Sequence, residues 1–367
     1  MTDIRLTRLA DLLVNYSTEV KPGDWVGILG DVVALPAMRE VYKAVLRAGG
    51  NPSVMISDEV MTRQFLREAS EDQVAWLDPS MTEYYEKADV YIRLGGTANT
   101  RSLSNIPGKR VQQVRAARSS WLDTRLERSA NGDFRWVGTN YPTEAGAQEA
   151  NMSLEEYEDF VYGATFCDTE DPVAEWNKIS EMQQHKVDYL VGKKHITCKG
   201  PRVDLELSIE GRTFINSDGH KNMPSGEIFT GPVEESVNGW VAFDYPSIVG
   251  GRAVSGIELK FENGKVVEAS AAQNEELLFA QLDTDAGARY LGEFAIGTNF
   301  GIQQFTGSIL FDEKIGGTIH MAIGMGYPET GSKNRSAVHW DMICDMRNDS
   351  EIHVDGELFY KNGEFKV

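Results

Sequence analysis

The strongest constraint on the fold is a change of pattern partway along the chain, at one long amphipathic segment. Residues 171–191 have the periodicity of a helix, with Val173, Trp176, Ile179, Met182 and Leu190 on its apolar face. Helical and strand patterns alternate before this segment, whereas frequent glycines and short alternating strands follow it. With 367 residues, the chain exceeds the size at which a single core stops growing. The sequence therefore predicts two domains, residues 1–190 and 191–367, with the long helix bridging them.

The first half predicts an open α/β domain. Short apolar runs that end in glycine or polar residues predict strands, and helical periodicity lies between them. The predicted strands are 24–30, 51–57, 88–96 and 134–140, and the clearest helices are 35–48 and 111–118. Strands that alternate with helices are typical of βαβ units, so we expect a mainly parallel sheet.

The second half predicts a mostly antiparallel β domain of the α+β type. Residues 203–209 alternate apolar and polar side chains, as a half-buried strand does. Asn263-Gly264 and Asn362-Gly363 carry the signal of tight hairpin turns. One clear helix is predicted at 274–283, and the remaining short strands fit a partly closed barrel.

Charge and composition exclude several classes of partner. The formal net charge is −20, which repels phosphate backbones and anionic membrane surfaces, so we expect neither a nucleic-acid nor a membrane partner. No apolar run approaches the roughly 18 residues that span a bilayer. The three cysteines form no CxxC pair and the N-terminus lacks an export signal, which together predict a reduced, cytoplasmic location. No glycine-rich segment has the spacing of a nucleotide-binding loop.

The densest set of possible metal ligands lies in the second half. It comprises Glu227, Glu293, His320, Tyr327, His339 and Asp341, and it includes two of only six histidines in the chain. Carboxylate oxygens together with imidazole nitrogens suit hard or borderline divalent cations. Because alternate side chains of a strand share a face, His339 and Asp341 should project together while Trp340 and Met342 pack on the other side.

Each of these residues also has an ordinary structural interpretation. His339 and Asp341 fit an exposed polar pair on an edge strand, and His320 fits a hydrogen-bonded core histidine. Tyr327 fits a surface loop, and the two glutamates fit strand ends. Taken together, however, the residues predict two divalent ions with one bridging carboxylate, which would lower the pKa of a shared water and polarise a carbonyl. A carboxylate that binds no metal could take the proton of that water.

The same segments resemble the aminopeptidase T family of metallopeptidases, the M29 class. The resemblance rests on Asn-Met-Pro-Ser-Gly-Glu-Ile-Phe-Thr-Gly-Pro at 222–232, Leu-Gly-Glu-Phe-Ala-Ile-Gly-Thr-Asn at 291–299, His320 with Tyr327, and His339-Trp-Asp341. It implies a cytoplasmic homodimer that removes N-terminal residues from short peptides, with two divalent ions per chain, zinc, cobalt or manganese. The implied metal ligands are Glu227, Glu293, His320, His339 and Asp341. Tyr327 is implied as a further ligand or as a stabiliser of the tetrahedral intermediate, and Glu293 is the expected bridge.

Two other functions remain open at this point. His320, His339 and Asp341 are the donor set of a mononuclear non-haem Fe(II) enzyme, and the family also resembles ring-cleaving dioxygenases that act on dihydroxypyridines. A catalytically silent family member would keep the fold without turnover. The glutamate pair separates the dinuclear aminopeptidase from the one-iron enzyme, because only a second metal requires both Glu227 and Glu293. His220 and His353 are not expected to bind metal.

Overall fold

The computed structural model describes residues 3–249 and 251–367, which divide into two compact units. Unit 1 comprises the described residues up to Val173 together with Gly219–Met223, and unit 2 comprises Ala174–Asp218 and the described residues from Pro224 to Val367. Each unit has its own sheets, which are described separately below.

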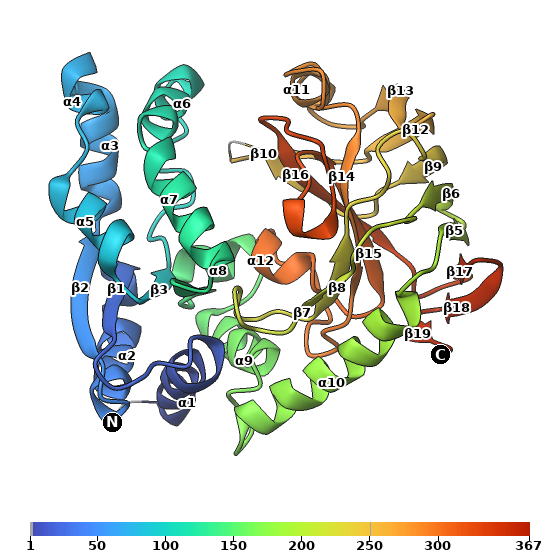
Figure 1. Ribbon diagram of the computed structural model, residues 1–367. Helices are drawn as coiled ribbons and strands as arrows, with labels where there is room; N and C mark the ends of the chain where they lie inside the picture. The colour runs from blue at the N-terminus through green and yellow to red at the C-terminus, as the bar shows by residue number, and fades with distance from the viewer. Residues whose placement is uncertain (1–2, 250) are drawn as a thin grey trace. The chain divides into compact units, whose positions relative to one another are not determined.

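Unit 1 is built on a four-stranded parallel sheet with the order β2-β1-β3-β4. Its elements are α1 (Ile4–Leu12), β1 (Trp25–Asp31), α2 (Leu35–Arg47), β2 (Asn51–Ser57), α3 (Glu59–Glu68), α4 (Glu71–Ala75), α5 (Pro79–Lys87), β3 (Val90–Gly95), α6 (Gly108–Ala117), α7 (Ser119–Ala130), β4 (Arg135–Asn140), α8 (Glu144–Glu149) and α9 (Leu154–Ala164) (Figure 1). The predicted strands and helices are all present, with ends that differ by up to three residues. The parallel α/β prediction is therefore confirmed.

Local sequence explains where these elements begin and end. The apolar run of β1 is buried in the sheet, with Val26 and Ile28 fully inaccessible. Helix α2 has a proline in its first turn and ends before Gly49, whose φ of +84° suits the left-handed residue after a helix. A capping box closes the start of α4, where Ser70 and Gln73 exchange side-chain and backbone hydrogen bonds.

A short segment from the second half of the sequence completes the edge of the unit 1 sheet. Asn222 forms a parallel bridge with Gly138 of β4. The Gly138 amide donates to the Lys221 carbonyl at 2.8 Å, and the Met223 amide donates to the Gly138 carbonyl at 2.9 Å. The chain then returns to unit 2 just before Glu227.

Unit 2 contains an eight-stranded sheet of order β13-β12-β9-β6-β5-β17-β18-β19 and a five-stranded sheet of order β16-β15-β14-β8-β7. Its elements are α10 (Pro172–Leu190), β5 (His195–Gly200), β6 (Val203–Ser208), β7 (Ile215–Ser217), β8 (Glu227–Thr230), β9 (Asn238–Ala242), β10 (Ser247–Val249), β11 (Arg252–Val254), β12 (Glu258–Glu262), β13 (Lys265–Ser270), α11 (Glu275–Leu282), β14 (Leu291–Gly297), α12 (Ile309–Asp312), β15 (Thr318–Gly324), β16 (His339–Asp345), β17 (Glu351–Val354), β18 (Glu357–Lys361) and β19 (Glu364–Phe365). Every pairing recorded within these two sheets is antiparallel, as predicted.

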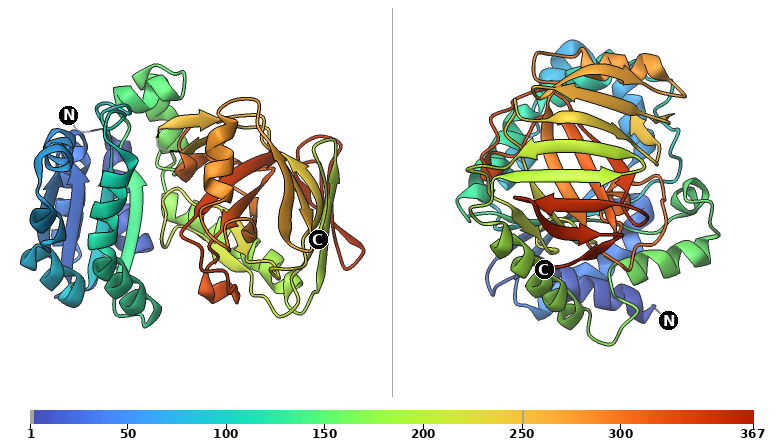
Figure 2. Two further views of the ribbon diagram at one scale, coloured as in Figure 1. Left: turned by 90° about the horizontal axis from the view of Figure 1, so that it is seen from above. Right: turned by 90° about the vertical axis from the view of Figure 1, so that its right-hand side faces the viewer.

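The core of unit 2 lies between its two sheets. Leu205 and Val241 of the first sheet share one buried cluster with Phe294, Met321 and Met342 of the second. Figure 2 shows the eight-stranded sheet in front in its right-hand view, with strands of the second sheet behind it. The partly closed barrel is therefore wrong, because each sheet keeps its own hydrogen-bonding order and the two meet through apolar faces.

Both Asn-Gly turns form the predicted hairpins. Glu262 pairs with Lys265 between β12 and β13, and the φ angles of Asn263 and Gly264 are +49° and +81°. The turn between β18 and β19 has the same pattern at Asn362 and Gly363, at +50° and +85°. Positive φ at both central residues is the conformation that asparagine and glycine favour in two-residue hairpin loops.

The predicted long helix forms α10 and packs on unit 2. Trp176 is fully buried, and the buried Gln183 amide donates to the Ser217 carbonyl at 3.0 Å. The same amide accepts a hydrogen bond from the Thr298 hydroxyl at 2.5 Å, beside the end of β14. Within residues 3–249 and 251–367, no helix combines the length and the hydropathy that a bilayer crossing needs.

A bulge in β14 places Leu291 and Glu293 on opposite faces of the sheet. Leu291 pairs with Ile323 of β15 and Glu293 with Ala322, so Gly292 is an extra residue in β14. In a regular strand Leu291 and Glu293 would share one face, because side chains alternate. The extra residue lets Leu291 lie in the core while Glu293 projects from the opposite face. A Cβ on Gly292 would lie 2.4 Å from the Gly324 carbonyl oxygen and 2.2 Å from that of Met325.

Gly292→Ala should therefore lower the free energy of unfolding by about 1–3 kcal/mol, since the added carbon meets backbone that cannot rotate away. Gly138→Ala in β4 is the matched control, because its added Cβ would have only Asn222 Oδ1 at 3.9 Å. Urea unfolding of both variants measures the difference. Equal stability losses would contradict the role assigned to the bulge.

Candidate metal centre

Four neighbouring strands of the five-stranded sheet carry five acidic or imidazole side chains on one face. Along the sheet these are Glu227 in β8, Glu293 in β14, His320 in β15, and His339 and Asp341 in β16 (Figure 1). Glu293 lies opposite Ala322, and Ala322 lies opposite Asp341. Because directly paired residues of antiparallel strands project to the same side, this register places both carboxylates on one face.

Small residues surround these side chains on the same face. Glu227 is paired with Gly297, His320 with Ala295, and His339 with Gly324. Each large polar side chain therefore has an alanine or glycine beside it on the next strand, which leaves room above the sheet. The opposite face is apolar, and Trp340 and Met342 belong to the core, as the alternation in β16 predicts.

Glu293 lies between two pairs that each combine an imidazole with a carboxylate. Its Oε1 is 3.6 Å from His320 Nε2, and its Oε2 is 3.4 Å from His339 Nε2. On one side, Glu227 Oε2 lies 3.4 Å from His320 Nε2. On the other side, Asp341 Oδ2 lies 3.6 Å from His339 Nε2. The two oxygens of one carboxylate thus face two different imidazoles.

This arrangement forms two groups of closely spaced ligand atoms that share Glu293. Glu227, Glu293 and His320 make the first group, and Glu293, His339 and Asp341 make the second. Within each group, one atom from each residue lies within 4.8 Å of the others, which is close enough to hold one cation. In the described part of the chain, no such group contains both histidines. The five predicted ligands are therefore together, but they divide into two sets of three with Glu293 in common.

His339 is held in the orientation that a metal ligand needs. Its Nδ1 lies 2.8 Å from the backbone oxygen of Met325, which can only accept a hydrogen bond. In the neutral ring the proton therefore belongs on Nδ1, and Nε2 has a lone pair directed toward the side of Glu293 and Asp341. A hydrogen bond from the outer nitrogen of a histidine to a carbonyl is a common way to fix a metal-binding imidazole.

Tyr327 follows β15 by three residues and lies next to the second group. Its ring makes edge contacts with the His339 ring at 5.3 Å and with the Phe229 ring at 5.5 Å between centroids. Burial raises the pKa of its phenol, and the carboxylates of Glu293 and Asp341 raise it further. The phenol therefore keeps its proton and can donate a hydrogen bond.

Two carboxylates anchor the loop between Tyr327 and His339. Glu234 accepts hydrogen bonds from the Lys333 amide at 2.6 Å and from the buried Arg212 at 2.6 Å. Asp285 accepts from the Ala337 amide at 2.7 Å and from the Ser336 hydroxyl at 3.0 Å. The loop is therefore attached at two points, which restricts the positions of Tyr327 and His339 at its two ends.

Sequence reasoning missed two residues at this site, Glu313 and Lys314. Lys314 is buried, and its ammonium donates to Glu227 Oε1 at 2.7 Å and also to Glu313. One oxygen of Glu313 forms a third group with His320 and Asp341. Lys-Ile-Gly-Gly after Asp-Glu has no recognisable motif, so the only signal was position, a few residues before His320.

Several buried polar atoms at the site have no hydrogen-bond partner. They are Glu227 Oε2, both ring nitrogens of His320, and Asp341 Oδ1. An unpaired polar atom in the interior costs free energy, and buried carboxylates are normally paired or bound to metal. Oxygen and nitrogen donors that face one another without partners fit divalent cations. The residues present therefore fit a metal centre.

The titration behaviour of the site reflects crowded charge. Burial lowers the pKa of His320, but Glu293 and Glu227 outweigh this effect and raise the pKa to about 9. Burial raises the pKa of Asp341 to about 7, although His339 opposes the rise. Burial would also raise the pKa of Glu293, but His320 and then His339 outweigh it and lower that pKa. Without cations, protons on the imidazoles balance part of the carboxylate charge, and bound cations would replace them.

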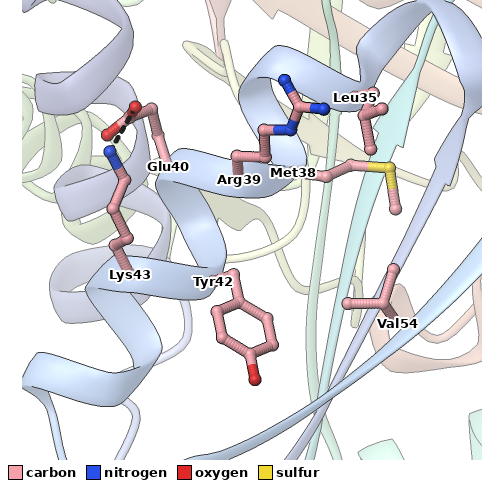
Figure 3. A pocket seen from close by; sticks show the side chains of 7 residues that line it. All are labelled: Leu35, Met38, Arg39, Glu40, Tyr42, Lys43 and Val54. Atoms are coloured by element: carbon pink, nitrogen blue, oxygen red, sulfur yellow. Dashed lines mark hydrogen bonds and ion pairs between the residues drawn. The ribbon is translucent and has the colours of Figure 1, made fainter.

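Unit 1 contains a cavity between α2 and β2. Its volume is about 600 Å³, and Leu35, Met38, Tyr42 and Val54 contribute apolar walls. Figure 3 shows the Lys43–Glu40 ion pair at one side of this cavity, with the two charged atoms 2.5 Å apart. Among its described lining residues there is one carboxylate and no histidine, so the chemistry of the metal centre is not found there.

Comparison with known proteins identifies a family and several relatives. The family model for thermophilic metalloproteases (M29) matches residues 2–365. Aminopeptidase T of Thermus thermophilus is 27% identical over 98% of this chain and 95% of its own length. Aminopeptidase 2 of Geobacillus stearothermophilus is 27% identical over 95% of this chain and 90% of its own.

Two solved structures share the fold. Wild-type AmpT from Thermus thermophilus superimposes with a TM-score of 0.87 at 25% identity, covering 99% of both chains. The 2,5-dihydroxypyridine dioxygenase of Pseudomonas putida has a TM-score of 0.61 at 14% identity, covering 99% of this chain and 97% of its own. The second likeness shows a common fold and nothing about activity.

Lys314→Met should destabilise the metal-free protein by about 3–5 kcal/mol, because it leaves the Glu227 carboxylate buried without its cation. Lys260→Met is the matched control. Lys260 also forms a 2.6 Å ion pair, with Glu268, but both side chains are exposed, so the loss should be far smaller. Urea unfolding in the presence of a chelator measures both. Losses of similar size would show that Lys314 does not balance buried charge.

Proposed function

Because the chain belongs to the M29 family of thermophilic metalloproteases, we propose that it is an aminopeptidase with a dinuclear divalent metal centre. It would release N-terminal residues from short peptides. The observation that carries this proposal is the position of Glu293, whose two oxygens face His320 and His339 in two separate groups of ligands. A carboxylate shared in this way is the arrangement that a bridged pair of ions requires.

The proposed ligands follow the two groups. Glu227, Glu293 and His320 would hold one ion, and Glu293, His339 and Asp341 would hold the other. Zinc, cobalt and manganese all suit this mixture of oxygen and nitrogen donors. When bound, such a pair of ions would polarise a carbonyl and lower the pKa of a bound water.

Residues of the chain itself would supply the proton transfers and the substrate contacts. Glu313 belongs to neither group that contains Glu293, and its side chain is 15% exposed, so its carboxylate can take a proton from the attacking water. Tyr327 would donate its phenolic hydrogen to the scissile carbonyl oxygen as negative charge develops there. Lys314 would hold Glu227 in place through Oε1 and leave Oε2 for the ion.

The one-iron dioxygenase is not favoured by this geometry. That reading requires His320, His339 and Asp341 around a single ion, but the two histidines fall into different groups. Glu293 lies between them and faces both. A catalytically silent protein is also disfavoured, because it gives no reason to keep buried donors without partners.

Residues 191–367 form the catalytic metal-binding domain, because every proposed ligand lies there. The protein acts in the cytoplasm, which the three buried and unpaired thiols support, since reduced cysteines fit that compartment. It works as a homodimer, which rests on the likeness to the family described from the sequence.

Chelation by EDTA or phenanthroline should abolish hydrolysis of leucyl-p-nitroanilide, because the ions are proposed to activate the water and polarise the carbonyl. Added zinc, cobalt or manganese should restore activity. Elemental analysis after dialysis against trace divalent metals should give about two ions per chain. Full activity in a metal-free preparation would contradict the proposal.

Glu293→Gln should lower activity by at least 100-fold and remove both ions together. Changing a residue that only supports a ligand already costs about 10–100-fold, and Glu293 contacts both groups. Glu268→Gln, on the exposed face of β13, is the matched control and should retain activity and metal content. His353→Ala should also keep both ions, since that ring pairs with Glu351. Normal turnover by the Glu293 variant would place the carboxylate away from the metals.

Tyr327→Phe should lower kcat by about 10²–10³-fold with an unchanged metal content, because one hydrogen-bond donor to the developing oxyanion is lost. Tyr189→Phe, which removes a surface hydrogen bond to Glu357, is the control. Steady-state kinetics and elemental analysis of the same samples separate two roles. Loss of an ion in the Tyr327 variant would identify the phenol as a ligand instead.

A further inference from the structure

A small cavity of about 250 Å³ adjoins the second ligand group within unit 2. It lies along β16, between that strand, the start of β10 and the residues that lead into α12. His339 and Asp341 contribute to its wall. Ligand sites for whole small molecules begin at about 300 Å³, so this cavity has room for one amino-acid side chain rather than several.

The remaining walls are largely apolar. Ile248, Phe305, Ile309 and Ile343 line the cavity, and no lysine or arginine is among its described lining residues. Ile343 is paired with His320 across the sheet, so it projects from the same face as Asp341. Ile248 and Ile309 are 44% and 47% exposed, which leaves apolar surface that a substrate could cover.

Hydrogen bonds and ring contacts hold the walls in place. Phe305 stacks on Tyr245 with ring centroids 5.2 Å apart, and the Tyr245 hydroxyl accepts a hydrogen bond from Arg347 at 2.9 Å. The Ser247 hydroxyl donates to the backbone oxygen of Asp341 at 2.6 Å, which ties the rim of β10 to the strand that carries the ligands. The cavity is therefore preformed.

One acidic residue in the wall, Asp312, is already engaged. Its Oδ1 accepts hydrogen bonds from the Thr306 amide at 2.7 Å and from the Thr306 hydroxyl at 2.8 Å, and the residue is 1% exposed. Its carboxylate therefore stabilises the turn before α12 and has little surface to offer a basic side chain. The absence of a cation among the described lining residues disfavours an acidic one.

We propose that this cavity binds the side chain of the N-terminal residue of the substrate and selects apolar residues of the size of leucine or phenylalanine. This inference rests on the proposed aminopeptidase function. In an aminopeptidase substrate, the free amine and the scissile carbonyl flank the first Cα. If both are held at the metals, the first side chain is the group that always lies beside them, where this cavity opens.

The test is a pair of tryptophan substitutions. Ile309→Trp fills the cavity from its exposed side, and Ile4→Trp makes the same change on α1, where the native side chain is 59% exposed. Metal content and kcat/KM are measured for alanyl-, leucyl- and phenylalanyl-p-nitroanilide with divalent cations present. Ile309→Trp should lower the leucyl-to-alanyl ratio of kcat/KM at least about tenfold, since one methylene in an apolar pocket already changes rates 10–200-fold. Ile4→Trp should leave that ratio unchanged.

Hydrolysis rates of the dipeptides Leu-Ala and Ala-Leu show whether the substitution changes selectivity for the first or the second residue of the substrate. Loss of selectivity for Leu-Ala supports the proposal, whereas a change that follows the second residue, an unchanged ratio or a uniform loss over all substrates overturns it. If Ile309→Trp does not fold, Ile309→Ala replaces it and should raise the phenylalanyl-to-leucyl ratio. If the wild-type protein loaded with cations hydrolyses no aminoacyl substrate, the proposed function itself fails, which is distinct from failure of the pocket.

Discussion

The carboxylate of Glu293, buried between two imidazoles, is the constraint on which the rest of unit 2 depends. A charged side chain that is only 4% exposed needs partners of opposite charge, and the imidazoles of His320 and His339 are the nearest groups that can serve. Neighbouring Glu227 and Asp341 add more negative charge than those rings can balance. Divalent cations between these oxygens and nitrogens would resolve the imbalance, and Lys314 already offsets part of it at Glu227.

Features of the backbone position and accommodate these charged side chains. The extra residue at Gly292 keeps Leu291 in the core while Glu293 projects from the opposite face, and glycine or alanine at the paired positions leaves room beside the ligand side chains. The core between the two sheets supplies rigidity from below. The Met325 carbonyl and the anchored loop after Tyr327 then fix His339, so the site is organised without requiring the ions themselves.

Periodicity and turn chemistry predicted most elements of both units, because they depend on near neighbours. The parallel strands of unit 1 and the Asn-Gly hairpins of unit 2 are examples. The alternation in β16 correctly separated His339 and Asp341 from Trp340. Contacts distant in sequence were not predictable: Asn222 joins the sheet of unit 1, and Lys314 reaches Glu227 from 87 residues away. Nor did any pattern mark Glu313 as a neighbour of His320.

The shared position of Glu293 is tested most directly by an anomalous difference map from crystals of the protein loaded with manganese or zinc. Two peaks are expected, one beside Glu227 and His320 and the other beside His339 and Asp341, with the Glu293 carboxylate between them. A single peak surrounded by His320, His339 and Asp341, with Glu293 turned away, would contradict it.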